Sequence, residues 1–144
     1  MASVSPASAD DTSSIQAKKT VNKKIKVLVV EDEPILSQSL AIELESYNYD
    51  VTTADNGEDG LNFFYKIKPD VVLLDLLMPK KNGFEVLEEL KTKNLLDSAH
   101  IIVLTNLGQE EDKKKAMALG AKHFFVKSAI DLEDLVNFIA KILA

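Results

Sequence analysis

The sequence predicts an α/β domain with a doubly wound parallel sheet of five strands, which alternate along the chain with five helices. Short, nearly continuous apolar runs rich in β-branched residues recur along the chain, as is typical of parallel strands buried on both faces. Segments with apolar residues at helical spacing lie between these runs. With 144 residues, 46% of them hydrophobic, the chain can build one domain with a sizeable core.

The strands are predicted with unequal strength. Three apolar runs give the strongest predictions, at Ile25–Val30, Val71–Leu74 and Ile101–Leu104. Two weaker strands fit at Tyr49–Thr53 and His123–Val126. All five runs are short, as strands of a globular domain usually are.

The first helix is predicted over residues 34–46, because Pro34 stands at a first-turn position, where the lack of an N–H group does no harm. Its spacing places on the inner side Ile35, Leu36, Leu40 and Leu44. The clearest helix covers residues 132–143, with an apolar face made of Leu132, Leu135, Val136, Ile139, Ala140 and Leu143.

Three further helices complete the alternation. The turn at Asp55–Gly60 is expected to start one helix, and Asn82-Gly83 precedes another, which carries Phe84, Leu87 and Leu90. The charged run Glu110–Lys115 is interpreted as the solvated face of the third. Residues 1–24, rich in Ser, Ala, Asp, Thr and Lys without periodicity, are expected to be a disordered leader or tag, so that the domain covers residues 25–144.

Charge and composition exclude several classes of function. The net charge of the chain is −6, and the leader, with four lysines and two aspartates, contributes +2. The remaining residues therefore carry a net charge of −8. A domain with this charge repels phosphate backbones. The chain has no arginine, so we expect no direct nucleic-acid binding. It has no cysteine, no secretory signal and no apolar run near the roughly 18 residues of a membrane span. We therefore expect a cytoplasmic protein without membrane insertion.

Residues that can carry chemistry follow four of the five predicted strands. Glu31-Asp32 follow the first, Asp75 the third, Thr105 the fourth and Lys127 the fifth. In open parallel sheets, active and binding sites lie at the carboxyl ends of the strands. Adjacent carboxylates repel unless a cation joins them, and a hard divalent cation such as Mg²⁺ suits oxygen ligands. The alternative is that acidic residues merely end strands, which could explain any one of the positions but explains all of them together poorly.

Four motifs in this order resemble the receiver domains of bacterial response regulators, over residues 25–144. They are Val29-Val-Glu-Asp-Glu-Pro34, then Asp75-Leu-Leu-Met-Pro79 followed by Gly83-Phe-Glu-Val-Leu87, then Leu104-Thr105, and Gly120-Ala-Lys-His-Phe-Phe-Val-Lys127. The resemblance implies a flavodoxin-like fold with strand order 2-1-3-4-5. It also implies a two-component signalling protein that takes a phosphoryl group from a sensor histidine kinase or a histidine phosphotransfer protein.

The resemblance also implies a role for each site residue. Asp75 would be the phosphoacceptor, with Lys127 and Thr105 contacting the phosphoryl oxygens and Phe124 acting as the switch residue. Mg²⁺ (or Mn²⁺) would be bound by Asp32, Asp75 and the backbone carbonyl of Leu77, with Glu31 acting through a water molecule. Such a protein catalyses its own phosphoryl transfer and is not a conventional enzyme.

The sequence departs from the family pattern at a few positions. Asn106 follows Thr105 where a smaller residue is usual, and Ser128 follows Lys127 where proline is usual. The switch position holds Phe124 instead of the frequent tyrosine. In receivers, the positions of Leu77 and Leu107 flank the path of the water that hydrolyses the aspartyl phosphate. Together with Asn106, these leucines are expected to slow autodephosphorylation.

Several outputs remain open from the sequence. A stand-alone response regulator would act on a downstream protein or form a homodimer through the face of the fourth helix, fifth strand and fifth helix (the 4-5-5 face). Alternatives are a phosphorelay intermediate that passes phosphate to a histidine phosphotransfer protein, or a scaffold that is never phosphorylated. The chain could also be a receiver excised from a longer protein.

Overall fold

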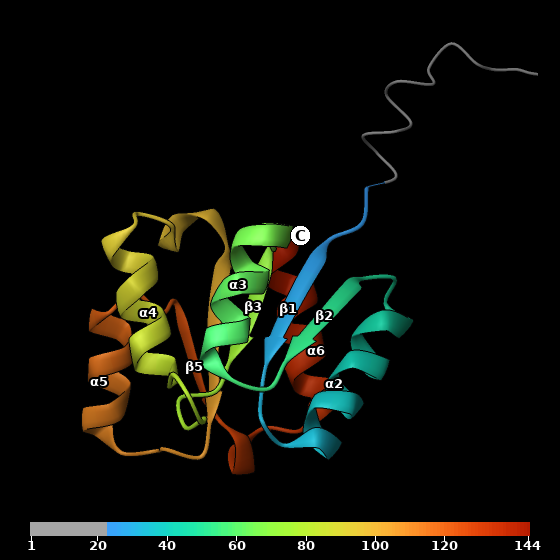
Figure 1. Ribbon diagram of the computed structural model, residues 1–144. Helices are drawn as coiled ribbons and strands as arrows, with labels where there is room; N and C mark the ends of the chain where they lie inside the picture. Colours follow the sequence, from blue (N-terminus) through green and yellow to red (C-terminus); the bar gives the residue numbers. More distant parts are fainter. Residues whose placement is uncertain (1–22) are drawn as a thin grey trace, which may run out of the picture.

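A computed structural model describes residues 23–144 of the chain (Figure 1). Its sheet is parallel, with the strand order β2-β1-β3-β4-β5. This order confirms the predicted fold. The strands are β1 (Lys26–Val30), β2 (Asp50–Ala54), β3 (Val71–Leu74), β4 (His100–Thr105) and β5 (His123–Val126).

Five helices lie within the described residues, one after each strand. They are α2 (Pro34–Ser46), α3 (Gly57–Ile67), α4 (Gly83–Thr92), α5 (Glu110–Ala118) and α6 (Leu132–Leu143), with short 3₁₀ turns at η1 (Leu96–Ser98) and η2 (Lys127–Ala129). In this part of the chain, no helix combines the length and apolar content needed to cross a membrane. The prediction of a disordered leader falls on residues 1–24, most of which lie outside the described residues.

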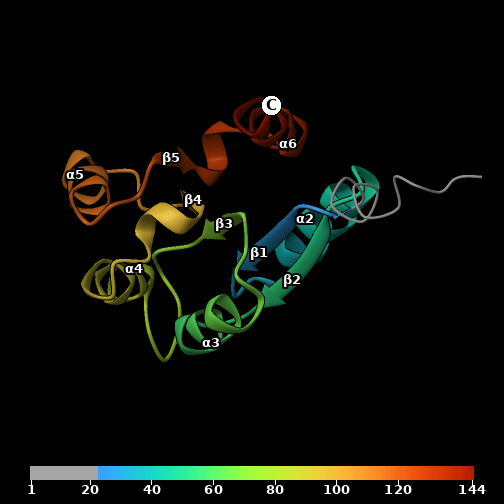
Figure 2. The same cartoon turned by 90° about the horizontal axis from the view of Figure 1, so that it is seen from above.

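The sheet separates two apolar layers. Helices α3, α4 and α5 cover one face, and α2 and α6 cover the other (Figures 1 and 2). Successive strand residues alternate between the layers, so Val27 and Val29 pack toward α2 and α6 while Leu28 and Val30 pack toward α3. Both faces of β1, β3 and β4 are therefore buried, which explains the nearly continuous apolar sequence of these strands.

One predicted core position is wrong. Ile35 was expected on the inner side of the first helix, but its side chain is 80% exposed. The buried side of α2 is set by Leu40 and Leu44, with Leu36 half-buried one turn earlier. Ile35 precedes Leu36 by about 100° around the helix, and so it points to solvent.

The helices differ in how firmly they are attached to the sheet. Helix α6 buries Leu135, Val136 and Ile139, whereas α5 buries only Ala116. Fewer buried apolar contacts mean a lower free energy of local opening. Helix α5 is therefore the least firmly packed helix of the described domain.

Side chains mark the starts of three helices. Asn82 and Glu85 form a capping box at α4, in which each side chain accepts a hydrogen bond from the other residue's backbone N–H. Asn56 caps α3 through Asp59 N, and Asp131 caps α6 through Asp134 N. These bonds satisfy N–H groups that have no partner within the helix.

Replacing Asn82 by alanine should lower the free energy of unfolding by about 1 kcal/mol, because the capping box is lost. Urea denaturation would measure the change. The control is Asn62→Ala at an exposed position inside α3, where alanine's higher helix propensity should leave stability unchanged or slightly raised. An equal loss in both variants would contradict the capping role.

Candidate functional site

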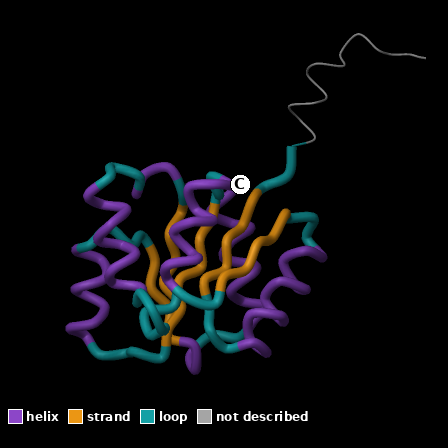
Figure 3. Tube along the Cα trace, in the orientation of Figure 1, coloured by secondary structure: helices purple, strands orange, loops and turns teal. Residues whose placement is uncertain are grey.

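The carboxyl ends of the strands bring the predicted site residues to one edge of the sheet. Val30 pairs with Leu74, so Glu31 and Asp75 leave β1 and β3 side by side. Thr105 pairs with Val126, and Lys127 follows directly. The loops that leave this edge lie at the bottom of Figure 3.

The ammonium group of Lys127 is the centre of the site. Its Nζ lies 2.9 Å from Glu31 Oε1, 3.0 Å from Asp75 Oδ2 and 2.9 Å from Glu33 Oε1. The side chains of Glu31, Asp75 and Lys127 are only 3%, 4% and 11% exposed. A charged group buried this deeply needs a partner of opposite charge. Lys127 is that partner for both carboxylates, and they in turn are its partners.

Burial and pairing act against each other on the charges. Burial raises the pKa of the Glu31 carboxyl, although the hydrogen bond from Lys127 works in the opposite direction. Burial alone would lower the pKa of Lys127, but hydrogen bonds to Glu33, Glu31 and Asp75 outweigh it and raise that pKa. Lys127 is therefore a permanent cation at neutral pH.

Three carboxylates form a group that could hold a metal ion. Glu31, Asp32 and Asp75 each offer an oxygen, and these oxygens lie within 4.8 Å of one another. Glu31 and Asp75 are buried and Asp32 is exposed, so the group opens to solvent on the side of Asp32. A set made only of carboxylate oxygens, with room for water, fits Mg²⁺ or Mn²⁺.

Thr105 ends β4 at this edge, and Phe124 lies farther back on β5, paired with Val103. Thr105 is fully buried, and its Oγ1 accepts a hydrogen bond from Leu107 N at 3.3 Å. Within residues 23–144, no hydrogen bond joins Thr105 to Asp75. Phe124 on β5 is half-buried and packs against the apolar layer that includes α5.

The three residues expected to affect hydrolysis differ in exposure. Leu77 is 54% exposed, and its backbone N–H donates to Asp75 Oδ1 at 3.3 Å. Asn106 is exposed. Leu107 is half-buried and packs against the same apolar layer as Phe124. Both leucines thus present hydrocarbon near Asp75 or Thr105, and neither side chain offers a hydrogen bond.

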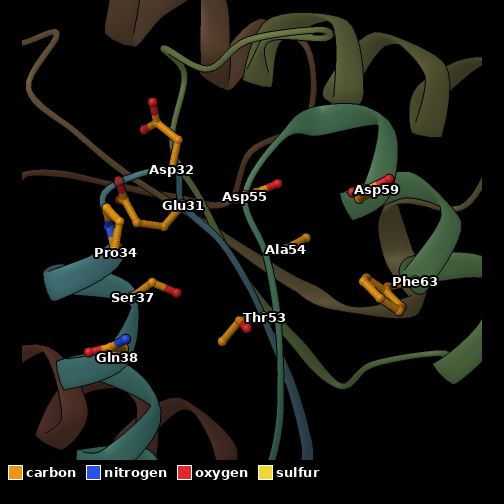
Figure 4. Close-up of a pocket in the computed structure, with 10 residues that line it drawn as sticks. All are labelled: Glu31, Asp32, Pro34, Ser37, Gln38, Thr53, Ala54, Asp55, Asp59 and Phe63. Atoms are coloured by element: carbon orange, nitrogen blue, oxygen red, sulfur yellow. The ribbon is translucent and has the colours of Figure 1, made fainter.

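A cleft of about 380 Å³ adjoins the carboxylates. Figure 4 shows it between the start of α2, with Pro34 and Ser37, and the segment that joins β2 to α3. Asp55 and Asp59 line its far wall. The opening of the site beside Asp32 is therefore acidic.

One residue of the site was missed by the sequence analysis. Glu33 contacts Lys127 as closely as Glu31 does, although it stands outside the group of possible metal ligands. Its side chain is 58% exposed and reaches in from the N-cap position of α2. The signal available in the sequence was its place directly after Glu31-Asp32.

Known proteins resemble this chain in both sequence and fold. Residues 27–140 match the model of the family described as response regulator receiver domain. Protein PilH of Pseudomonas aeruginosa is 34% identical over 119 residues, which cover 83% of this chain and 98% of PilH. The chemotaxis protein CheY4 of Vibrio cholerae has a solved structure with a TM-score of 0.75 and 28% identity, covering 83% of this chain and 99% of that chain.

Other relatives are longer than the matched region. The probable transcriptional regulator ycf27 of Guillardia theta is 40% identical over 104 residues, which cover 72% of this chain and 40% of that protein. This chain thus spans less than half the length of the ycf27 relatives. The family match over residues 27–140, the strand order and the acidic edge agree with one another. The chain belongs to the response regulator receiver domain family of two-component signalling.

Proposed function

We propose that Asp75 accepts a phosphoryl group from a phosphohistidine and that the domain, residues 25–144, acts as a phosphorylation switch. The observation that carries this proposal is the contact of Lys127 Nζ with Asp75 Oδ2, 3.0 Å apart, beside the buried Glu31. A lysine held against a buried carboxylate, next to a group of possible metal ligands, supplies the charges that phosphoryl transfer requires.

In the proposed transfer, a carboxylate oxygen of Asp75 forms the new bond to phosphorus as the bond from phosphorus to the histidine nitrogen breaks. The electron pair of that bond returns to the imidazole, which takes up a proton from solvent. Lys127 and the Thr105 hydroxyl then donate hydrogen bonds to the phosphoryl oxygens. Mg²⁺, held by Asp32, Asp75 and the Leu77 carbonyl, with Glu31 acting through water, would supply positive charge against those oxygens.

We place the output on the face formed by α5, β5 and α6, which is the 4-5-5 face of the sequence analysis. β5 is an edge strand that lies between α5 and α6 (Figure 2), and α5 buries only Ala116. Movement of Thr105 toward a phosphoryl group would free space next to Phe124, on the neighbouring strand. Weak packing of α5 makes this face the easiest to change.

The partners that we propose are a sensor histidine kinase or histidine phosphotransfer protein upstream, and a downstream protein or a second copy of the domain. Onward transfer to a histidine phosphotransfer protein remains the alternative output. A scaffold that is never phosphorylated is disfavoured, because Glu31, Asp32, Asp75 and Lys127 lie together. The proposed location is the cytoplasm.

The ycf27 relatives are named as probable transcriptional regulators. This conflicts mildly with the expectation that the present protein does not bind nucleic acid directly. This chain aligns with only 40% of the Guillardia protein. We therefore restrict the expectation of no direct nucleic-acid contact to residues 25–144, whose net charge is negative.

Incubation with acetyl phosphate and Mg²⁺ should add one phosphoryl group, detected as a gain in intact mass. Asp75→Asn should show no gain, because the amide cannot act as the nucleophile. Asp32→Ala, and the parent protein with a chelator, should show little gain. A phosphoryl-sized gain that persists in Asp75→Asn would refute the assignment of the acceptor.

Phosphorylation should change amide hydrogen exchange mainly in α5, β5 and α6, because the switch acts through Thr105 and Phe124. Asp75→Asn treated in the same way serves as the control. Changes confined to α2, on the other side of the sheet, would contradict the proposed output face.

The phosphorylated state should decay slowly, because Leu77 and Leu107 offer no hydrogen bond that orients a water molecule. Leu77→Asn combined with Leu107→Glu should accelerate decay by up to about 10²-fold, the lower end of what a positioned polar group contributes. Phosphate half-lives would measure this, with exposed Ile42→Asn on α2 as the matched control. The single variant Leu77→Asn is included because Leu107 packs against the core, and an unchanged half-life in both site variants would show that these leucines do not set the rate.

A further inference from the structure

A cluster of polar side chains lies outside the phosphorylation site, where α3, α4 and the loop between β3 and α4 meet. It consists of Tyr65, Lys81, Glu89 and Lys93, and is called the Glu89 cluster below. Tyr65 belongs to α3, Glu89 to α4, and Lys93 to the C-cap of α4. Lys81 belongs to the loop that starts at Asp75. The cluster therefore connects two helices to the loop that carries the phosphoacceptor.

Glu89 accepts hydrogen bonds from three donors. Lys81 Nζ lies 3.0 Å from Oε1, Lys93 Nζ lies 3.2 Å from Oε2, and the Tyr65 hydroxyl also donates to Oε2. Lys93 further donates to Tyr65 Oη at 2.9 Å and stands 4.5 Å from the ring centroid. The hydrogen bonds from Tyr65 and Lys81 lower the pKa of the Glu89 carboxyl to about 2, so this group is ionised throughout the physiological range.

The backbone of the same loop packs closely against two glycines. A Cβ atom on Gly57 would lie 2.0 Å from the carbonyl oxygen of Lys81, and a Cβ on Gly83 would lie 2.3 Å from that of Asp75. Only glycine allows such close approach. At its start, the loop is bonded to the phosphoacceptor itself, through Leu77 N and Asp75 Oδ1. The loop between Asp75 and Gly83 is thus fixed at both ends.

Between these fixed points, the backbone adopts an unfavourable conformation. Lys80 has a φ of 66°, in the left-handed region, which costs a non-glycine residue free energy and persists only where neighbouring contacts impose it. The next residue, Lys81, supplies such a contact through its side chain on Glu89. Leu77, whose carbonyl is a proposed metal ligand, lies four residues before Lys81 in this loop.

We propose that the Glu89 cluster positions the loop between β3 and α4, and thereby the Leu77 carbonyl, for binding of the divalent cation. This inference rests on the proposed function. Lys81 and Glu89 are positioning residues that touch neither the phosphoryl group nor the cation. An ion pair near the surface, such as the half-buried pair of Lys81 and Glu89, contributes little to global stability, so its effect is expected in the geometry of the loop. Residues that orient metal ligands commonly affect metal affinity strongly.

Lys81→Met gives a test in which positioning and simple electrostatics predict opposite signs. Removing a positive charge near a cation site should strengthen Mg²⁺ binding through space. Releasing the loop from Glu89 should weaken it. Lys80→Met is the matched control, because it removes the same charge from the preceding residue, and Lys80 forms no ion pair within residues 23–144.

The experiment is calorimetric titration of the unphosphorylated protein with Mg²⁺, at a temperature where circular dichroism shows every variant folded. Lys81→Met should weaken Mg²⁺ binding about three- to tenfold, less than the roughly 10–100-fold typical of residues bonded directly to a metal ligand. Lys80→Met should bind Mg²⁺ as tightly as the parent or more tightly. Lys81→Arg, which can still pair with Glu89, should retain most of the parent affinity.

The outcomes separate this inference from the proposed function. If the parent binds no Mg²⁺, or Asp32→Ala binds it equally well, the proposed metal site is wrong and the inference falls with it. If the parent binds Mg²⁺ through Asp32 but Lys81→Met binds it equally well or more tightly, only the inference is overturned. Equal weakening in Lys80→Met and Lys81→Met would also overturn it, because the effect would then not depend on Glu89.

Discussion

The ammonium group of Lys127 allows the carboxylates of Glu31, Glu33 and Asp75 to lie close together at one edge of the sheet. Glu31 and Asp75 are almost fully buried, and without a cation their negative charges would raise the free energy of the folded state. Lys127 is 96 residues from Glu31 and 52 from Asp75 in the sequence. The parallel sheet, covered on both faces, fixes the ends of three strands firmly enough for these contacts to form.

The same arrangement would allow the charges at the site to change partners while the fold stays constant. The side chains that carry charge follow the strands, and the residues before them belong to the two apolar layers. A cation or a phosphoryl group at this edge would therefore change which charges are paired and would leave the packing of β1 and β3 intact. The exception is Thr105, which is fully buried beside the half-buried Phe124. There the site adjoins the apolar layer that contains Phe124.

The sequence predicted the sheet because buried parallel strands leave a strong local pattern. All five strands were located to within one residue at each end, and the strand ends correctly indicated Glu31, Asp75 and Lys127 as neighbours. The inward position of Ile35 was wrong, because adjacent positions at a helix start differ by about 100° and the pattern does not choose between them.

Polar contacts made from helices and their caps could not be predicted from the sequence. Glu33 reaches Lys127 across 94 residues, and Tyr65 meets Glu89 across 24. Neither contact follows a helical or strand period, because each depends on how two elements pack against one another. Helix α5 was also difficult to predict from apolar periodicity, because Ala116 is its only buried residue.

Glu33 belongs both to the site and to the start of a helix. It occupies the N-cap of α2, yet its side chain makes no capping hydrogen bond, because the carboxylate lies on Lys127 instead. Asn56, Asn82 and Asp131, at the same position in α3, α4 and α6, all cap their helices. Pro34 at the first position of α2 reduces the loss, since it has no N–H group to satisfy. Helix α2 thus lacks the stabilisation of a side-chain cap, and the same carboxylate supplies the site with one more negative charge. A single side chain therefore exchanges local helix stability for charge at the site.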